Sequence, residues 1–80
     1  MNTKQAVAKR IIELCNQRHI AINALATESG ISPSTIYSML NDKSNNPGVV
    51  SIKKLCDGLG ISVRTFFDSP LFDDLEQEIK

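Results

Sequence analysis

The chain contains few of the residues on which enzymes and metal sites depend. It has one histidine, two cysteines and no tryptophan among 80 residues. Cys15 and Cys56 form no Cys-x-x-Cys pair, and His19 has no neighbour at metal-ligand spacing, so we expect buried free thiols, no metal and no cofactor. These residues do not supply a nucleophile, a base and an orienting group. We therefore predict no catalytic residues.

Long apolar runs are also missing. No stretch approaches the ~20 residues that a membrane-spanning helix needs, and residues 1–5 lead into no apolar signal-peptide region. We expect a cytoplasmic protein with no membrane association. Because 41% of the residues are hydrophobic and 22% are charged, the composition is that of one folded globular domain.

The chain has no net charge, with nine basic and nine acidic side chains. This average hides two regions of opposite sign. Residues 1–67 hold eight basic side chains against four acidic ones, a balance of +4, and residues 68–80 hold five acidic side chains against one lysine, a balance of −4. We predict a moderately basic domain at 1–67 and an acidic amphipathic tail at 68–80.

Hydrophobic periodicity predicts an all-α fold of five helices, and no segment alternates with the period of a strand. Gly30 and Gly60 fit the left-handed position after a helix, whereas Ser32 and Ser62 fit the N-cap of the next one. The expected helices cover residues 3–18, 22–29, 33–41, a fourth segment with its apolar stripe at 52–59, and 63–67. A last turn or two is expected to begin at Ser69-Pro70.

The connection between the second and third predicted helices is the most informative feature. Leu25 and Ala26 lie on the inner face of a two-turn helix, Gly30 supplies a tight corner, and Ile31 and Ile36 bracket the start of the next helix. Two short helices joined by a corner of three to four residues are typical of a helix-turn-helix.

The same residues carry a resemblance to a known family. Residues 25–36, LATESGISPSTI, are followed by Asn46-Pro47, by residues 52–62, IKKLCDGLGIS, and by Phe66-Phe67. Over residues 5–67 this pattern resembles the Cro/phage-repressor (XRE-type) helix-turn-helix family. The resemblance implies a lambda-repressor-like domain that binds operator DNA as a symmetric dimer and regulates transcription.

By the same resemblance, the helix that begins at Pro33 is the recognition helix in the major groove. Residues expected at base edges are Pro33, Ser34, Thr35, Tyr37 and Ser38. Residues expected at phosphates are Asn23, Asn41, Lys43, Ser44 and Asn45, with Asn46, Lys9 and Arg10 as supporting candidates. Two residues depart from the family pattern, because Pro33 has no side-chain donor and Ala21 occupies the usual cap position of the second helix.

The tail carries more apolar residues than the end of a small monomer needs. These residues either cap the core or form a dimer seam; the candidates are Phe67, Leu71, Phe72, Leu75 and Ile79. Because the tail is acidic, we expect it to lie away from bound DNA. Tyr37 is likewise open to two interpretations, as a DNA contact or as a residue that packs on the flanking loop.

The leading hypothesis is therefore a DNA-binding regulator whose partners are double-stranded DNA and a second copy of the chain. A phage or mobile-element repressor, a host regulator and an antitoxin that represses its own operon all fit this description. The alternative is a protein-interaction module that kept the fold without DNA binding and holds a partner through the tail. Serine and threonine hydroxyls pair with several bases, so the operator sequence is not readable.

Overall fold

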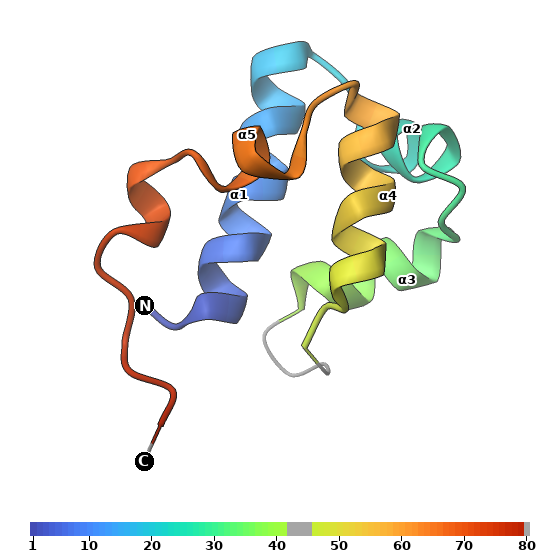
Figure 1. The fold of residues 1–80 in the computed structure, drawn as a ribbon. Helices are drawn as coiled ribbons and strands as arrows, with labels where there is room; N and C mark the ends of the chain where they lie inside the picture. The colour runs from blue at the N-terminus through green and yellow to red at the C-terminus, as the bar shows by residue number, and fades with distance from the viewer. Residues whose placement is uncertain (42–45, 80) are drawn as a thin grey trace.

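A computed structural model describes residues 1–41 and 46–79, which form helices connected by short turns (Figure 1). The elements are α1 (Thr3–Arg18), α2 (Ile22–Glu28), α3 (Pro33–Leu40), α4 (Val49–Leu59), α5 (Val63–Phe67) and the 3-10 turn η1 (Pro70–Phe72). The described residues contain no strand. The prediction of an all-α fold with five helices is confirmed, and η1 is the single turn that follows Ser69.

Three helices end in the same way. Gly30 after α2 and Gly60 after α4 have φ angles of 66° and 70°, and each is followed by an isoleucine whose N–H reaches back into the helix. Ile31 donates to the carbonyl of Ala26 and Ile61 to that of Cys56, both at 2.9 Å, as in a Schellman motif. His19 takes the corresponding left-handed position after α1, at φ 55°. The one histidine of the sequence is therefore the residue that ends α1.

Helices α1, α3 and α5 begin at side-chain caps, and the sequence predicts the caps of α3 and α5. The Ser32 hydroxyl accepts from the Thr35 N–H at 3.2 Å, and the Ser62 hydroxyl accepts from the Thr65 N–H at 3.0 Å. Asn2 forms a reciprocal capping box with Gln5 at the start of α1. Each cap satisfies N–H groups that have no partner inside the helix, so these serines fix where α3 and α5 start.

The hydrophobic core draws on all five helices. Each contributes a side chain with no exposed surface, namely Ile11, Leu25, Ile36, Leu55 and Phe66. Cys15 and Cys56 are buried in the same cluster as free thiols, as predicted. Burial of this shared apolar surface is the main driving force for such a small domain, and it holds α2, α3 and α4 together against α1.

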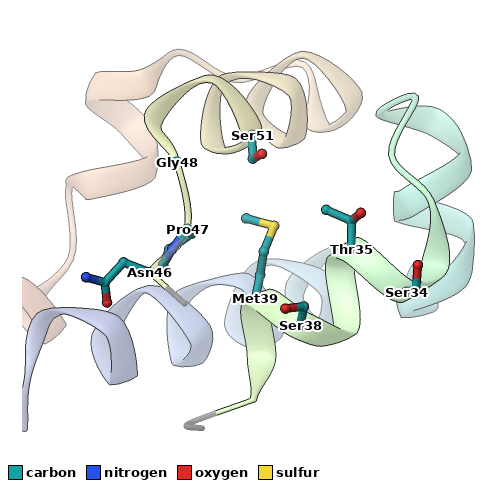
Figure 2. A pocket seen from close by; sticks show the side chains of 8 residues that line it. All are labelled: Ser34, Thr35, Ser38, Met39, Asn46, Pro47, Gly48 and Ser51. Atoms are coloured by element: carbon teal, nitrogen blue, oxygen red, sulfur yellow. The ribbon is translucent and has the colours of Figure 1, made fainter. Parts of the chain in front are cut away.

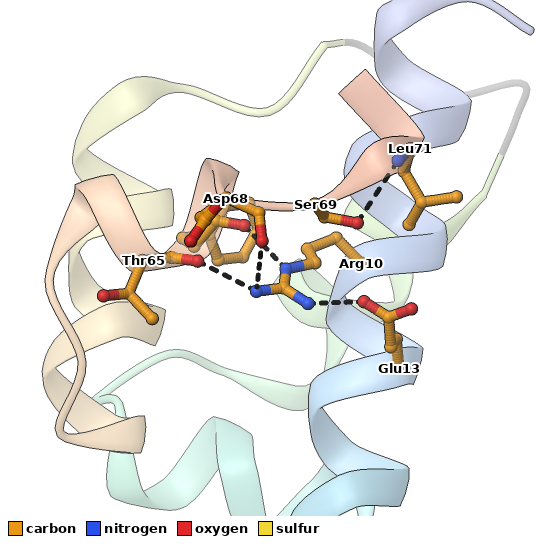
Figure 3. A network of polar contacts seen from close by, with 7 residues as sticks. Arg10, Glu13, Thr65, Asp68, Ser69 and Leu71 are labelled. Carbon is orange, nitrogen blue, oxygen red and sulfur yellow. Dashed lines mark hydrogen bonds and ion pairs between the residues drawn. The ribbon is translucent and has the colours of Figure 1, made fainter. Parts of the chain in front are cut away.

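A buried arginine joins α1 to the end of α5 (Figure 3). Arg10 is only 6% exposed; its Nε donates to the Phe66 carbonyl at 2.6 Å, and its Nη2 donates to the Thr65 carbonyl at 2.8 Å and to that of Asp68 at 3.5 Å. Its Nη1 pairs with Glu13. Arg10 is therefore not a surface charge, and its guanidinium is not available for the phosphate contact considered from the sequence.

The chain beyond α5 is partly packed and contains no α-helix in its described residues, only the 3-10 turn η1. Phe67 and Phe72 lie beside Phe66, with ring centroids 4.9 Å and 6.4 Å from it. After η1, residues 73–79 form no helix. The helical spacing of Leu71, Leu75 and Ile79 therefore does not produce one continuous apolar stripe.

Helices α2 and α4 approach closely where Ser29 meets Gly58. A Cβ atom placed on Gly58 would lie 2.2 Å from Ser29 Oγ and 3.1 Å from the Ser29 Cα. Ser29 is 8% exposed, and its hydroxyl has no hydrogen-bond partner among the described residues. Glycine at this position allows the contact between the two helices.

We predict that Arg10→Met destabilises the domain by about 2–3 kcal/mol, because it leaves carbonyls at the end of α5 without their charged donor. Lys9→Met is the matched control, since Lys9 is the exposed neighbour on the same helix and should change stability by less than about 0.5 kcal/mol. Urea unfolding followed by circular dichroism measures both. Equal costs for the two variants would show that the Arg10 contacts contribute nothing.

We also predict that Gly58→Ala is destabilising. Overpacking costs about 1–3 kcal/mol. The close approach to the Ser29 side chain and backbone favours the upper part of this range, above the roughly 1 kcal/mol that alanine gains over glycine in a helix. Ser29→Ala should be close to neutral, because it removes an unpartnered hydroxyl. The double variant should recover part of the loss, since the Oγ contact disappears and the backbone contact remains. An unfolding series that shows strict additivity would contradict this steric explanation.

Candidate nucleic-acid interface

The outer face of α3 is polar and carries no charge. Ser34, Thr35 and Ser38 are all exposed, and the helix Pro33–Leu40 contains no acidic or basic residue. Ile36 and Met39 are the buried residues of this helix. The exposed side of α3 therefore presents a row of hydroxyl groups.

This face borders a hollow of about 370 Å³ between α3 and the start of α4. We call it the recognition hollow; it is lined by Ser34, Thr35, Ser38, Met39, Asn46, Pro47, Gly48 and Ser51. Figure 2 shows Thr35 and Met39 directed from α3 toward α4, and Ser51 directed back from α4. Three of the residues expected at base edges therefore meet in one place.

The hydroxyl groups at the start of α3 are tied to one another. Ser32 Oγ lies 2.8 Å from Thr35 Oγ1 and 3.2 Å from Ser34 Oγ, and it also caps the helix. A hydroxyl both donates and accepts, so these contacts orient Ser34 and Thr35 and leave further capacity for hydrogen bonds. Ser38 lies one turn later on the same face.

The contribution of α4 to this surface was missed from the sequence. Helix α4 begins at Val49, three residues before Ile52, where its apolar stripe starts. Val49 and Val50 are 70% and 66% exposed, so they do not belong to the buried apolar stripe from which the helix was predicted. The sequence signal for the start of the helix was Pro47-Gly48, since Gly48 is the N-cap. This early start brings Ser51 opposite α3.

Other residues expected to contact DNA lie outside the recognition hollow. Pro33 and Tyr37 are exposed on α3 but do not line it. Asn23 is exposed in the first turn of α2. Asn41 ends α3, and its carbonyl accepts a hydrogen bond from Lys4 Nζ. Lys43, Ser44 and Asn45 lie outside the described residues.

Two further features concern the start of α2 and an ion pair on α4. Ala21 is the N-cap of α2 and makes no side-chain cap, which agrees with the departure seen in the sequence. On α4, Lys53 Nζ donates a hydrogen bond to the Asp57 carboxylate. This hydrogen bond, followed by the negative charge of Asp57, raises the pKa of Lys53. The positive charge of Lys53 is thus partly balanced within its own helix.

The apolar residues proposed for a dimer seam fall into two groups. Leu71, Phe72 and Leu75 are half-buried, and Phe72 packs against the core. Phe67 and Ile79 are 37% and 81% exposed. The structure therefore assigns part of this set to capping the core and leaves the rest on the surface.

No group of three or more metal-ligating side chains lies close together in residues 1–41 and 46–79. None of the helices in this part of the chain is long and apolar enough to span a membrane. Cys15 and Cys56 are buried free thiols, and burial raises the pKa of both.

Comparison with known families identifies the class of the domain. Residues 10–69 match the family of Cro/C1-type HTH DNA-binding domains. The fold is thus a helix-turn-helix DNA-binding domain of a kind found in regulators, with α2 and α3 as its two helices. The chain belongs to this Cro/C1-type family, and the resemblance seen in the sequence is confirmed.

Two solved structures are similar over most of the chain. The crystal structure of the prophage Lp1 protein 11 has a TM-score of 0.82 and 37% identity, and the match covers 94% of this chain and 100% of that one. A Tyr-to-Phe variant of the restriction-modification controller protein C.Esp1396I has a TM-score of 0.72, covering 84% of this chain and 86% of its own. At 22% identity, the second likeness concerns the fold alone. No curated protein matches the sequence.

We predict that Cys15 and Cys56 react slowly with a disulfide reagent in the folded protein. The thiolate is the reactive form, and a raised pKa lowers the thiolate fraction at a given pH while burial blocks access. Labelling with Ellman's reagent at mildly alkaline pH should follow unfolding and become fast in guanidinium chloride. Labelling of the native protein at the rate of free cysteine would contradict this prediction.

Proposed function

We propose that the chain is a sequence-specific transcriptional repressor that binds a palindromic operator as a dimer. The observation that carries the proposal is the uncharged hydroxyl face of α3, which opens onto the recognition hollow. Buried residues Ile36 and Met39 fix its orientation. A rigid, short, polar helix with its inner side in the core is suited to the major groove.

The chemistry of this face suggests how it reads DNA. Serine and threonine hydroxyls pair with several bases, and apolar Pro33 offers only a contact such as one to a thymine methyl. Without an arginine or glutamine on α3, discrimination between bases rests on the fit of several weak contacts and on DNA shape. Affinity then comes from phosphate contacts, for which the candidates are Asn23, Asn41, Lys43, Ser44 and Asn45.

The proposed dimer would form through the exposed apolar residues near the end of the chain. Phe67, the last residue of α5, and Ile79 in the tail expose apolar surface, and a symmetric contact between two copies would cover it. A two-fold axis in the protein requires inverted half-sites in the operator. Similarity to a prophage protein favours a phage or mobile-element repressor over an antitoxin within this class.

A protein-interaction module is the second candidate. It is favoured by the exposed apolar pair Val49 and Val50, which lies at the edge of the proposed DNA surface. The absence of a side-chain cap at Ala21 points the same way. In this case a protein partner, rather than a nucleic acid, would cover the start of α4.

Selection from a pool of random DNA separates the two candidates. A repressor should enrich a palindromic site whose half-sites lie about one helical turn apart. Sedimentation of the protein with the selected duplex should give two chains per site. If no motif is enriched even at low salt, the DNA-binding proposal fails and the interaction module becomes the better explanation.

Within the selected site, we predict that Ser34→Ala combined with Ser38→Ala weakens discrimination between bases by about 1–3 kcal/mol per affected base pair. Binding to unrelated DNA should change little, because phosphate contacts remain. Asn16→Ala is the control, since Asn16 is exposed near the end of α1 and does not line the recognition hollow. Equal loss on selected and unrelated DNA would place these serines at phosphates instead.

A further inference from the structure

The acidic segment after η1 returns to the beginning of the chain and lies beside the N-terminal end of α1 (Figure 1). The Glu76 N–H donates to the Met1 carbonyl at 3.1 Å. The Glu78 carboxylate accepts from the Thr3 N–H at 3.2 Å and from the Thr3 hydroxyl at 3.0 Å. We call Glu76 and Glu78, with these contacts, the acidic latch.

The latch binds where α1 offers unpaired donors and positive potential. Thr3 is the first residue of the helix, so its N–H has no acceptor within α1. The helix dipole adds partial positive charge at this end, and the Met1 ammonium lies 3.6 Å from Glu76 Oε2. The anions bound at this end of the helix are therefore the Glu76 and Glu78 carboxylates of the same chain.

The latch also lies next to the proposed DNA surface. A second hollow of about 580 Å³, which we call the tail hollow, has a wall formed by Glu78, Thr3 and Lys4; its remaining lining residues are Asn2, Val7, Asn46, Pro47, Ile52 and Phe67. Asn46 and Pro47 line the recognition hollow as well. Glu78 therefore lines a hollow that shares two lining residues with the recognition hollow, although the sequence led us to expect the tail away from DNA.

Negative charge in this position opposes a DNA backbone that approaches α3. Glu78 occupies the Thr3 donors that are free to bind a phosphate when the tail is absent. Lys4, which lines the same hollow, reaches the carbonyl of Asn41 at the end of α3. The beginning of α1 thus carries basic and hydrogen-bond donor groups, and the tail carboxylates contact Met1 and Thr3 among them.

We propose that the acidic latch is an intramolecular competitor of the DNA backbone and lowers affinity for DNA of every sequence. The inference rests on the proposed function. Because the latch meets phosphates and not bases, it acts equally on operator and unrelated duplexes. Tight binding then requires base-specific contacts, and binding to DNA outside the operator is weaker.

The test compares two full-length variants that remove the same charge. Glu76→Gln with Glu78→Gln neutralises the latch, and Asp73→Asn with Asp74→Asn neutralises two exposed carboxylates nearer η1. Fluorescence anisotropy measures binding to a short duplex of unrelated sequence and to the selected operator. At about 50 mM salt the latch variant should bind both roughly three- to tenfold more tightly than the unaltered chain, and the difference should shrink near 200 mM.

Each outcome bears on the inference. A larger gain for the latch variant than for the aspartate variant supports it. Equal gains in the two charge variants would assign the effect to total charge and overturn the latch. Unchanged affinity, or a change on one duplex only, would overturn it while the proposed function stands. Failure of every form to bind either duplex would reject both.

Discussion

The contact between Arg10 and the carbonyl groups at the end of α5 is the interaction on which the second half of the molecule depends. Five residues are too few for a helix to be stable alone, and its last carbonyls have no partner inside it. One planar guanidinium satisfies several of them at once. Because α5 is held in this way, Phe66 stays in the core and the chain leaves toward α1, where the acidic segment can meet Thr3.

The recognition surface is held from both ends in a comparable manner. At its start, Ser32 caps α3 and Ile31 anchors the corner in the core. At its end, Lys4 binds the carbonyl of Asn41. A helix of two turns fixed at both ends presents its hydroxyl groups in a defined geometry. Because α3 has no charged residue, positive potential near it comes from neighbouring elements.

The sequence predicted the features that depend on local signals. Gly30 and Ser32 determine the corner of the helix-turn-helix through backbone conformation and capping, and both effects act within a few residues. The role of Arg10 was missed because its partners are backbone carbonyls 55 to 58 positions away, which leave no signature in side-chain type. The contact between Thr3 and the Glu78 carboxylate was missed because the two residues lie 75 positions apart.

Asn46 and Pro47 belong to both hollows, and proline has a fixed φ angle and restricts the backbone of the residue before it. Charge acts over about a Debye length without direct contact, so the tail carboxylates that we propose as competitors of the DNA backbone need not touch α3. Affinity and sequence preference would then be separately adjustable in a chain of 80 residues.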